Sequence, residues 1–103
     1  MSVKAHTFTI ANGATDSNIV DLDNRSLIGF RFPTMTGTSL TIKESDGTPV
    51  SLGDESAAIT ISNPSGRSVR FYPLFGMRRV QLVSGGAEAA ERTIQALTDD
   101  YTG

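Results

Sequence analysis

The sequence predicts an all-β domain, a two-sheet antiparallel β-sandwich of jelly-roll or Greek-key topology with about eight short strands. Apolar and polar side chains alternate with the two-residue period of a half-buried strand in most apolar segments. Turn-forming Gly, Pro, Asn and Asp separate these segments at intervals of about 8–12 residues. A parallel α/β fold is excluded, because the chain has no crossover helices between its strands.

The first half of the chain contains four expected strands, at residues 7–10, 19–22, 26–32 and 40–43. Pro33 ends the third strand because proline has no amide donor. Asp46-Gly47 is the dipeptide that two-residue hairpin turns prefer, so we expect a hairpin from 40–43 into a strand at 49–52.

The second half contains strands at 59–62, 69–72 and 79–82, with Pro73 ending the second of these. The linker at 74–77 is either the turn of a hairpin or a tight crossing between sheets. Residues 87–98 fit both a helix and a strand, and we prefer a strand at 91–98 because it closes a sheet. Residues 84–90 are then a projecting Gly-rich loop, and we expect residues 84–86 within it to be flexible.

The 103 residues form one expected domain, 1–103, with mobile segments at 1–5 and 99–103. The net charge of −2 argues against nucleic-acid binding. No apolar run is long enough for a signal sequence or a membrane span, so we expect no membrane contact. The absence of cysteine excludes disulfides and thiolate chemistry.

No residue cluster predicts an enzyme, a metal site or a cofactor. The single histidine, His6, is expected to be an exposed strand residue with no carboxylate nearby in the sequence. Residues 21–24 resemble the start of a calcium loop, but Phe32 stands where a bidentate Glu is required, so we expect a turn. Residues 84–86 lack the second flanking glycine of a hydrolase elbow and the lysine of a P-loop.

Candidate partner-binding residues lie in two connectors that are unusually apolar for loops. Met35, Leu74, Phe75 and Met77 follow prolines that end strands. They either plug an open end of the sandwich or form an exposed interface for another protein.

Arginines are the second group of candidates. Arg70, Arg79 and Arg92 alternate with apolar residues, so they are expected on outer faces and could form a stripe. If 69–72 and 79–82 form a hairpin, Tyr72 faces Arg79 and Arg70 faces Gln81, giving a cation-π pair and donors for partner carboxylates.

Four segments, at 29–33, 39–47, 78–85 and 91–94, together resemble small virion structural proteins of tailed bacteriophages. They contain an aromatic-proline strand end, a Ser-Asp-Gly hairpin, an Arg-Val-Gln-Leu strand leading into Ser-Gly, and a closing strand. Members of that family often have a tryptophan soon after the proline, whereas this chain has Thr36 in that region.

The resemblance implies a non-enzymatic capsid decoration or cement protein, or a neck or tail component of the same particle. Its expected partners are the major capsid protein or other virion proteins, and a homo-oligomer, dimer or trimer, is implied. Its expected location is the virion, assembled in the host bacterial cytoplasm. The alternative is a carbohydrate-binding module, because the Ser-Asp-Gly and Arg-Val-Gln-Leu segments are also similar to discoidin-like domains. Because the chain has no tryptophan, it is poorly suited to stack an aromatic side chain against a sugar ring.

Overall fold

The computed structural model describes residues 3–51, 58–74 and 78–100, and these contain eight strands and no helix. The strands are β1 (Val3–Ile10), β2 (Val20–Asp21), β3 (Ser26–Arg31), β4 (Ser39–Glu44), β5 (Thr60–Ser62), β6 (Ser68–Leu74), β7 (Arg79–Ser84) and β8 (Arg92–Asp99). The predicted all-β class is confirmed. The C-terminal segment is the preferred strand and not a helix.

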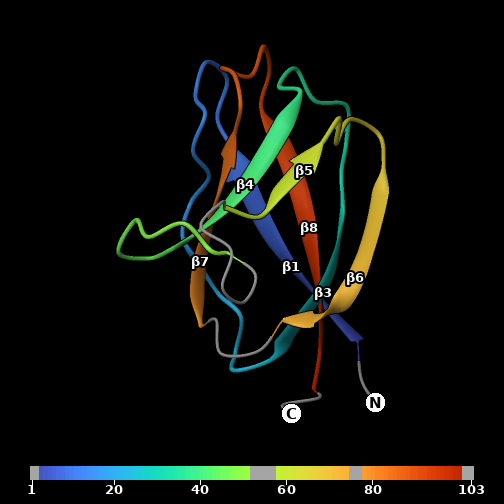
Figure 1. Ribbon diagram of the computed structural model, residues 1–103. Coiled ribbons are helices and arrows are strands. Elements are labelled where there is room, and N and C mark those ends of the chain that lie inside the picture. The colour runs from blue at the N-terminus through green and yellow to red at the C-terminus, as the bar shows by residue number, and fades with distance from the viewer. Residues whose placement is uncertain (1–2, 52–57, 75–77, 101–103) are drawn as a thin grey trace.

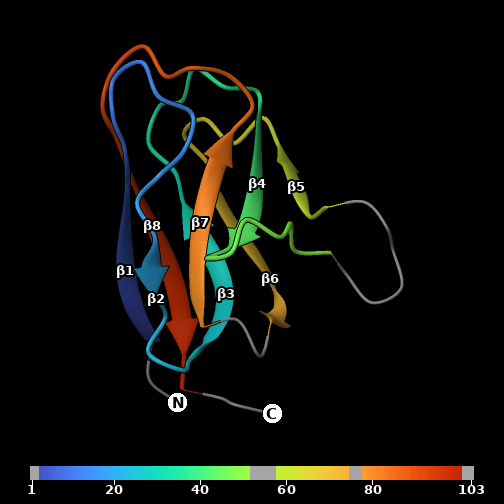
Figure 2. The same ribbon diagram turned by 90° about the vertical axis from the view of Figure 1, so that its left-hand side faces the viewer.

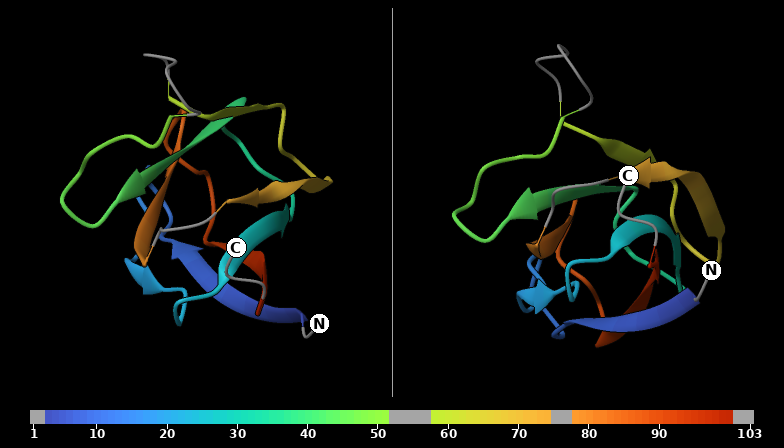
Figure 3. Two further views of the ribbon diagram at one scale, coloured as in Figure 1. Left: turned by 60° about the horizontal axis from the view of Figure 1, so that its bottom comes forward. Right: turned by 90° about the horizontal axis from the view of Figure 1, so that it is seen from below.

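Two four-stranded antiparallel sheets build the molecule, in the orders β1-β8-β3-β6 and β2-β7-β4-β5 (Figure 1). Every connection except that from β4 to β5 passes from one sheet to the other. This alternation gives the strand order of a jelly roll. The two sheets face each other in the side view and in the views from below (Figures 2 and 3). The predicted β-sandwich is therefore confirmed.

The core lies between the two sheets, where strand alternation directs every second side chain inward. Burial of a large apolar side chain contributes about 1.5–3 kcal/mol, so these positions dominate the stability of the fold. The completely buried apolar side chains are those of Phe8, Ile10, Leu22, Leu27, Phe30, Leu40, Ile42, Val80, Leu82, Ile94 and Ala96.

Two predicted strand boundaries are wrong. β6 continues through Pro73 to Leu74, which pairs with Leu27. Proline is accepted there because β6 is the edge strand of its sheet. Of the segment expected as a strand at 49–52, residues 49–51 are described, and they form isolated bridges from Pro49 to Lys43 and from Ser51 to Ala58.

The expected turn before that segment is present. Gly47 has a φ of 90°, which glycine adopts without strain. The Asp46 carboxylate accepts a hydrogen bond from the Thr48 amide at 2.9 Å, and the Glu44 amide donates to the Thr48 carbonyl. The Asp-Gly pair therefore turns the chain back towards β4, as predicted.

The first and last described strands begin and end at the same end of the sandwich, because Val3 pairs with Asp99. Asp21, Leu74 and Arg79 also lie there, and we call it the terminal end. β1 pairs with β8 from Val3 onward. Parts of the segments expected to be mobile, residues 3–5 and Asp99, thus belong to paired strands.

Candidate functional site

The apolar connector residues behave as a plug wherever the structure describes them. Met35 is only 7% exposed and belongs to the core cluster, and its amide donates to Ser65 Oγ at 2.9 Å. Leu74 is half-buried and packs against the same cluster. The interface interpretation is therefore wrong for Met35, whose side chain cannot reach a partner. Phe75 and Met77 lie outside the described residues.

The predicted arginine stripe does not form, because β6 and β7 belong to different sheets. The linker between them is a sheet crossing, so Arg70 does not face Gln81 and the backbone of Tyr72 does not pair with that of Arg79. The Tyr72 side chain lies outside the described structure. Both Arg70 and Arg79 are exposed, as predicted, but they project from opposite layers of the sandwich.

Arg70 lies over the neighbouring strand instead of facing β7. Its Nη1 donates to Ser68 Oγ at 3.2 Å. Its side chain passes close to Gly29, where any added Cβ would also clash with the Val69 carbonyl oxygen. A bulge in β3 brings this backbone close, so only glycine fits.

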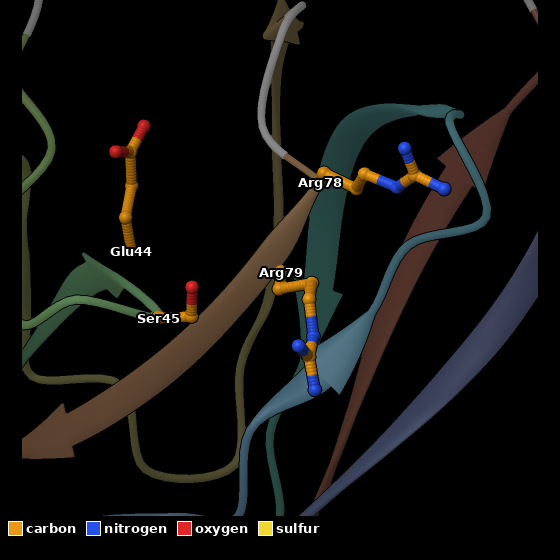
Figure 4. Close-up of a pocket in the computed structure, with 4 residues that line it drawn as sticks. All are labelled: Glu44, Ser45, Arg78 and Arg79. Carbon is orange, nitrogen blue, oxygen red and sulfur yellow. The ribbon is translucent and has the colours of Figure 1, made fainter.

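Arg79 instead helps to line an open pocket of about 280 Å³ at the terminal end, together with Glu44, Ser45 and Arg78. Backbone hydrogen bonds fix this corner, since the Ser45 amide donates to the Arg79 carbonyl at 3.0 Å. Figure 4 shows the two guanidinium groups pointing in different directions, with the Glu44 carboxylate directed away from both. Arg78 and Arg79 are exposed and form no ion pair with any described residue.

A buried carboxylate organises the opposite end of the sandwich. Glu88 is 1% exposed, and its Oε1 accepts hydrogen bonds from the Thr36 amide at 2.8 Å and Arg92 Nε at 3.0 Å. Its Oε2 accepts from the Gly37 amide at 2.9 Å and the Ser84 hydroxyl at 2.7 Å. Glu88 therefore joins two connectors that are far apart in the sequence.

These contacts make Glu88 a structural anion. Burial alone would raise the pKa of Glu88, but the hydrogen bonds from Thr36, Ser84, Gly37 and Arg92 outweigh it and lower the pKa to about 2. The Glu88 amide also donates to the Ala14 carbonyl at 3.0 Å. Residues 85–90 form a loop, as predicted, and Glu88 anchors this loop to the connector at residues 36–37.

His6 is buried, with 7% of its surface exposed, so the prediction of an exposed histidine is also wrong. Its Nε2 lies 2.9 Å from Thr98 Oγ1, and its Nδ1 lies 4.0 Å from Asp23 Oδ2. Burial lowers the pKa of His6, against the attraction of Asp23 and together with the repulsion of Lys4 and Arg25. The sequence placed no carboxylate near this histidine, whereas the fold does.

The order Thr98, His6, Asp23 resembles the hydroxyl, imidazole and carboxylate of a hydrolase triad. Thr98 is completely buried, however, and its Oγ1 also accepts a hydrogen bond from Arg25 Nε at 3.0 Å. A nucleophile must reach the substrate and be activated towards it. This geometry therefore supports a structural role for the three residues.

The turn at residues 21–24 is formed as expected. The Asp21 carboxylate accepts from the Asp23 amide at 2.8 Å, and Asp23 and Asn24 both have positive φ. Across residues 3–51, 58–74 and 78–100, no three His, Asp or Glu side chains are grouped to hold a metal ion. The Asp21 carboxylate therefore caps the backbone of the turn, and the Asp23 carboxylate pairs with Lys4 at 2.8 Å.

The comparisons with known proteins add no relative. No protein family, curated protein or solved structure matches the chain. Within the described segments, no helix is long and apolar enough to cross a membrane. Function must therefore be argued from the chain's own surfaces.

Proposed function

We propose that this chain is a non-enzymatic structural protein of a bacteriophage particle, a capsid decoration or cement protein that binds other capsid subunits. The resemblance of four sequence segments to small phage virion proteins supports the proposal. The jelly-roll architecture also supports it, because that architecture recurs in viral capsid domains and in lectin domains. This second argument is an analogy between folds, and a binding function depends on a particular surface.

The observation that carries the proposal is the pair of exposed guanidinium groups at the terminal end. Arg78 and Arg79 open onto the pocket with Glu44 and Ser45, and no described residue neutralises them. A guanidinium donates two parallel hydrogen bonds to a carboxylate, and arginine is enriched at protein interfaces. An acidic loop of a neighbouring capsid subunit is the partner that this surface fits.

The mechanism is adhesion through many repeated contacts. Each subunit would gain roughly 25 cal/mol gross for every Å² of apolar surface buried, and the capsid symmetry repeats that contact over the shell. Phe75 and Met77, which precede Arg78 in the sequence, remain predicted contributors of this apolar area. Charge pairs at Arg78 and Arg79 would fix the orientation of docking.

Binding to particles that lack the protein tests the proposal. Capsids assembled without the gene should bind the purified chain saturably, as measured by cosedimentation. Arg79→Glu should weaken this binding about 10- to 100-fold, because a carboxylate would then face the partner's acidic group. Arg31→Glu is the matched control, an exposed strand arginine away from the pocket, and it should bind like the wild type.

Three outcomes contradict the proposal. If the Arg79→Glu and Arg31→Glu variants bound capsids equally, the pocket would have no role in capsid binding. Absence of capsid binding, together with saturable binding on a glycan array, would favour the carbohydrate-binding alternative. Binding to isolated necks or tails and not to capsids would place the chain elsewhere in the particle.

A further inference from the structure

β1 differs from the other three sheet edges of the described structure. The edge strands β2 and β5 are two and three residues long, and β6 contains Pro73. Short strands, prolines and charges are the usual features that keep exposed edges from pairing. β1 has eight residues and no proline, and its Lys4 charge is balanced by Asp23 at 2.8 Å.

The unpaired backbone groups of β1 can be assigned from its hydrogen bonds. The Thr9 amide donates to Asn18 Oδ1 at 2.8 Å, and the Thr9 carbonyl accepts from the Asn18 amide at 3.3 Å. Odd-numbered residues therefore direct their amides and carbonyls away from β8, since these directions alternate along an antiparallel strand. In the part of the chain that is described, the outward groups of Val3, Ala5 and Thr7 have no partner.

We propose that β1 pairs antiparallel with β1 of a second copy of this chain, across a twofold axis at Ala5. In this register Ala5 lies opposite Ala5 of the second copy, and Val3 lies opposite its Thr7. Each of these residues then exchanges backbone hydrogen bonds with its opposite number, so every outward group is satisfied. The outward backbone groups of Thr9 are already bonded to Asn18, so the free edge is limited to a segment centred on Ala5. The β1-β8-β3-β6 sheets of the two copies would then join into one continuous sheet.

The side chains along this edge suit a second copy. Val3, Ala5 and Thr7 are exposed and uncharged, so two copies meet on this face without charge repulsion. The exposed large hydrophobic residues of the described chain are Val3, at 58%, and Ile19, at 45%. In the twofold register, Val3 of one copy lies opposite Thr7 of the other. Thr7 is two residues from Thr9, which bonds to Asn18, and Ile19 is the next residue after Asn18. Figure 2 shows β1 as the outermost strand of its sheet.

The association state of the purified chain tests this inference independently of the virion proposal. Sedimentation equilibrium should give a species of twice the 10.9 kDa chain mass. Ala5→Lys should weaken dimerisation at least tenfold, because two lysines would lie directly opposite each other at the axis. Thr93→Lys is the matched control, since Thr93 is an exposed strand residue of β8, and this variant should remain dimeric. Thermal melting checks that both variants fold.

A cysteine variant tests the register directly. The chain has no cysteine, so Ala5→Cys can form only an intermolecular disulfide. Opposed strand residues have Cα atoms about 5.5 Å apart, within disulfide range, so oxidation should cross-link two copies. Thr93→Cys should stay monomeric on a non-reducing gel. A wild-type chain that is monomeric at its highest soluble concentration, or an Ala5→Lys variant that dimerises normally, would overturn the inference.

Discussion

Glu88 is the residue on which the loop end of the sandwich depends. Its carboxylate receives four hydrogen bonds, from two backbone amides, a hydroxyl and a guanidinium. A buried charge is costly unless its hydrogen bonds are satisfied, and this one is satisfied on both oxygens. Gly37 lets the connector approach, because a Cβ there would clash with Ser84 Oγ. The carboxylate thereby holds the connectors around residues 36–37 and 84–92 together.

Replacing this carboxylate should destabilise the protein strongly. Glu88→Gln keeps the shape but turns an amide donor towards the backbone donors of Thr36 and Gly37, so we expect a loss of about 3 kcal/mol. Urea unfolding measures the change. Glu91→Gln, at an exposed neighbouring position, should alter stability by less than about 0.5 kcal/mol. Equal stabilities of the two variants would show that the four hydrogen bonds contribute nothing.

Acid should reveal the same contribution in the wild type. The pKa of Glu88 is about 2 in the folded protein, against an ordinary value of 4.5. A carboxyl whose folded pKa is lowered stabilises the fold fully above pH 4.5, and this stabilisation of about 3 kcal/mol is lost as the pH falls towards 2. Unfolding free energies of wild type and Glu88→Gln should therefore converge over this range. A constant difference between them would contradict the assignment.

At the scale of elements, the strands were predictable and their partners were not. Alternation depends on each strand's own residues, so β3, β4, β7 and β8 were expected close to where they form. Pairing depends on contacts between distant segments, so the separation of β6 and β7 into different sheets had no local signal. Glu88 was missed because its partners Thr36 and Gly37 lie about fifty residues away. Its spacing of four residues from both Ser84 and Arg92 was the local sign.

The pairing of β1 with β8 should depend on pH through His6. Burial lowers the pKa of this imidazole, so its neutral form stabilises the fold fully above the ordinary value of 6.5. This stabilisation is lost as the pH falls below 6.5, because the unfolded chain binds the proton more readily. Lys4 and Arg25 oppose protonation, while Asp23 and Asp21 favour it. The wild type should therefore lose stability in this range, and His6→Gln should lose less.

NMR titration of the imidazole measures this pKa directly. The account predicts a midpoint below 6.5 in the folded protein. A midpoint at or above 6.5 would mean that the nearby carboxylates outweigh burial, and the predicted loss of stability would then not occur.

The whole molecule divides its polar residues between two ends. At the loop end, the Glu88 carboxylate accepts four hydrogen bonds that hold the connectors together. The terminal end leaves Arg78 and Arg79 without a described ion pair around an open pocket. The free edge of β1 begins at Val3, at this same end, and continues through Ala5 to Thr7. Docking would use the side chains of Arg78 and Arg79, whereas pairing would use the outward backbone groups of β1.

Electron cryomicroscopy of particles made with and without the gene tests the central claim most directly. The account predicts additional density on the complete particle, of the size of this jelly roll, with the Arg78–Arg79 end against a neighbouring capsid subunit. Identical density in the two particles, together with absence of the chain from purified virions, would contradict it.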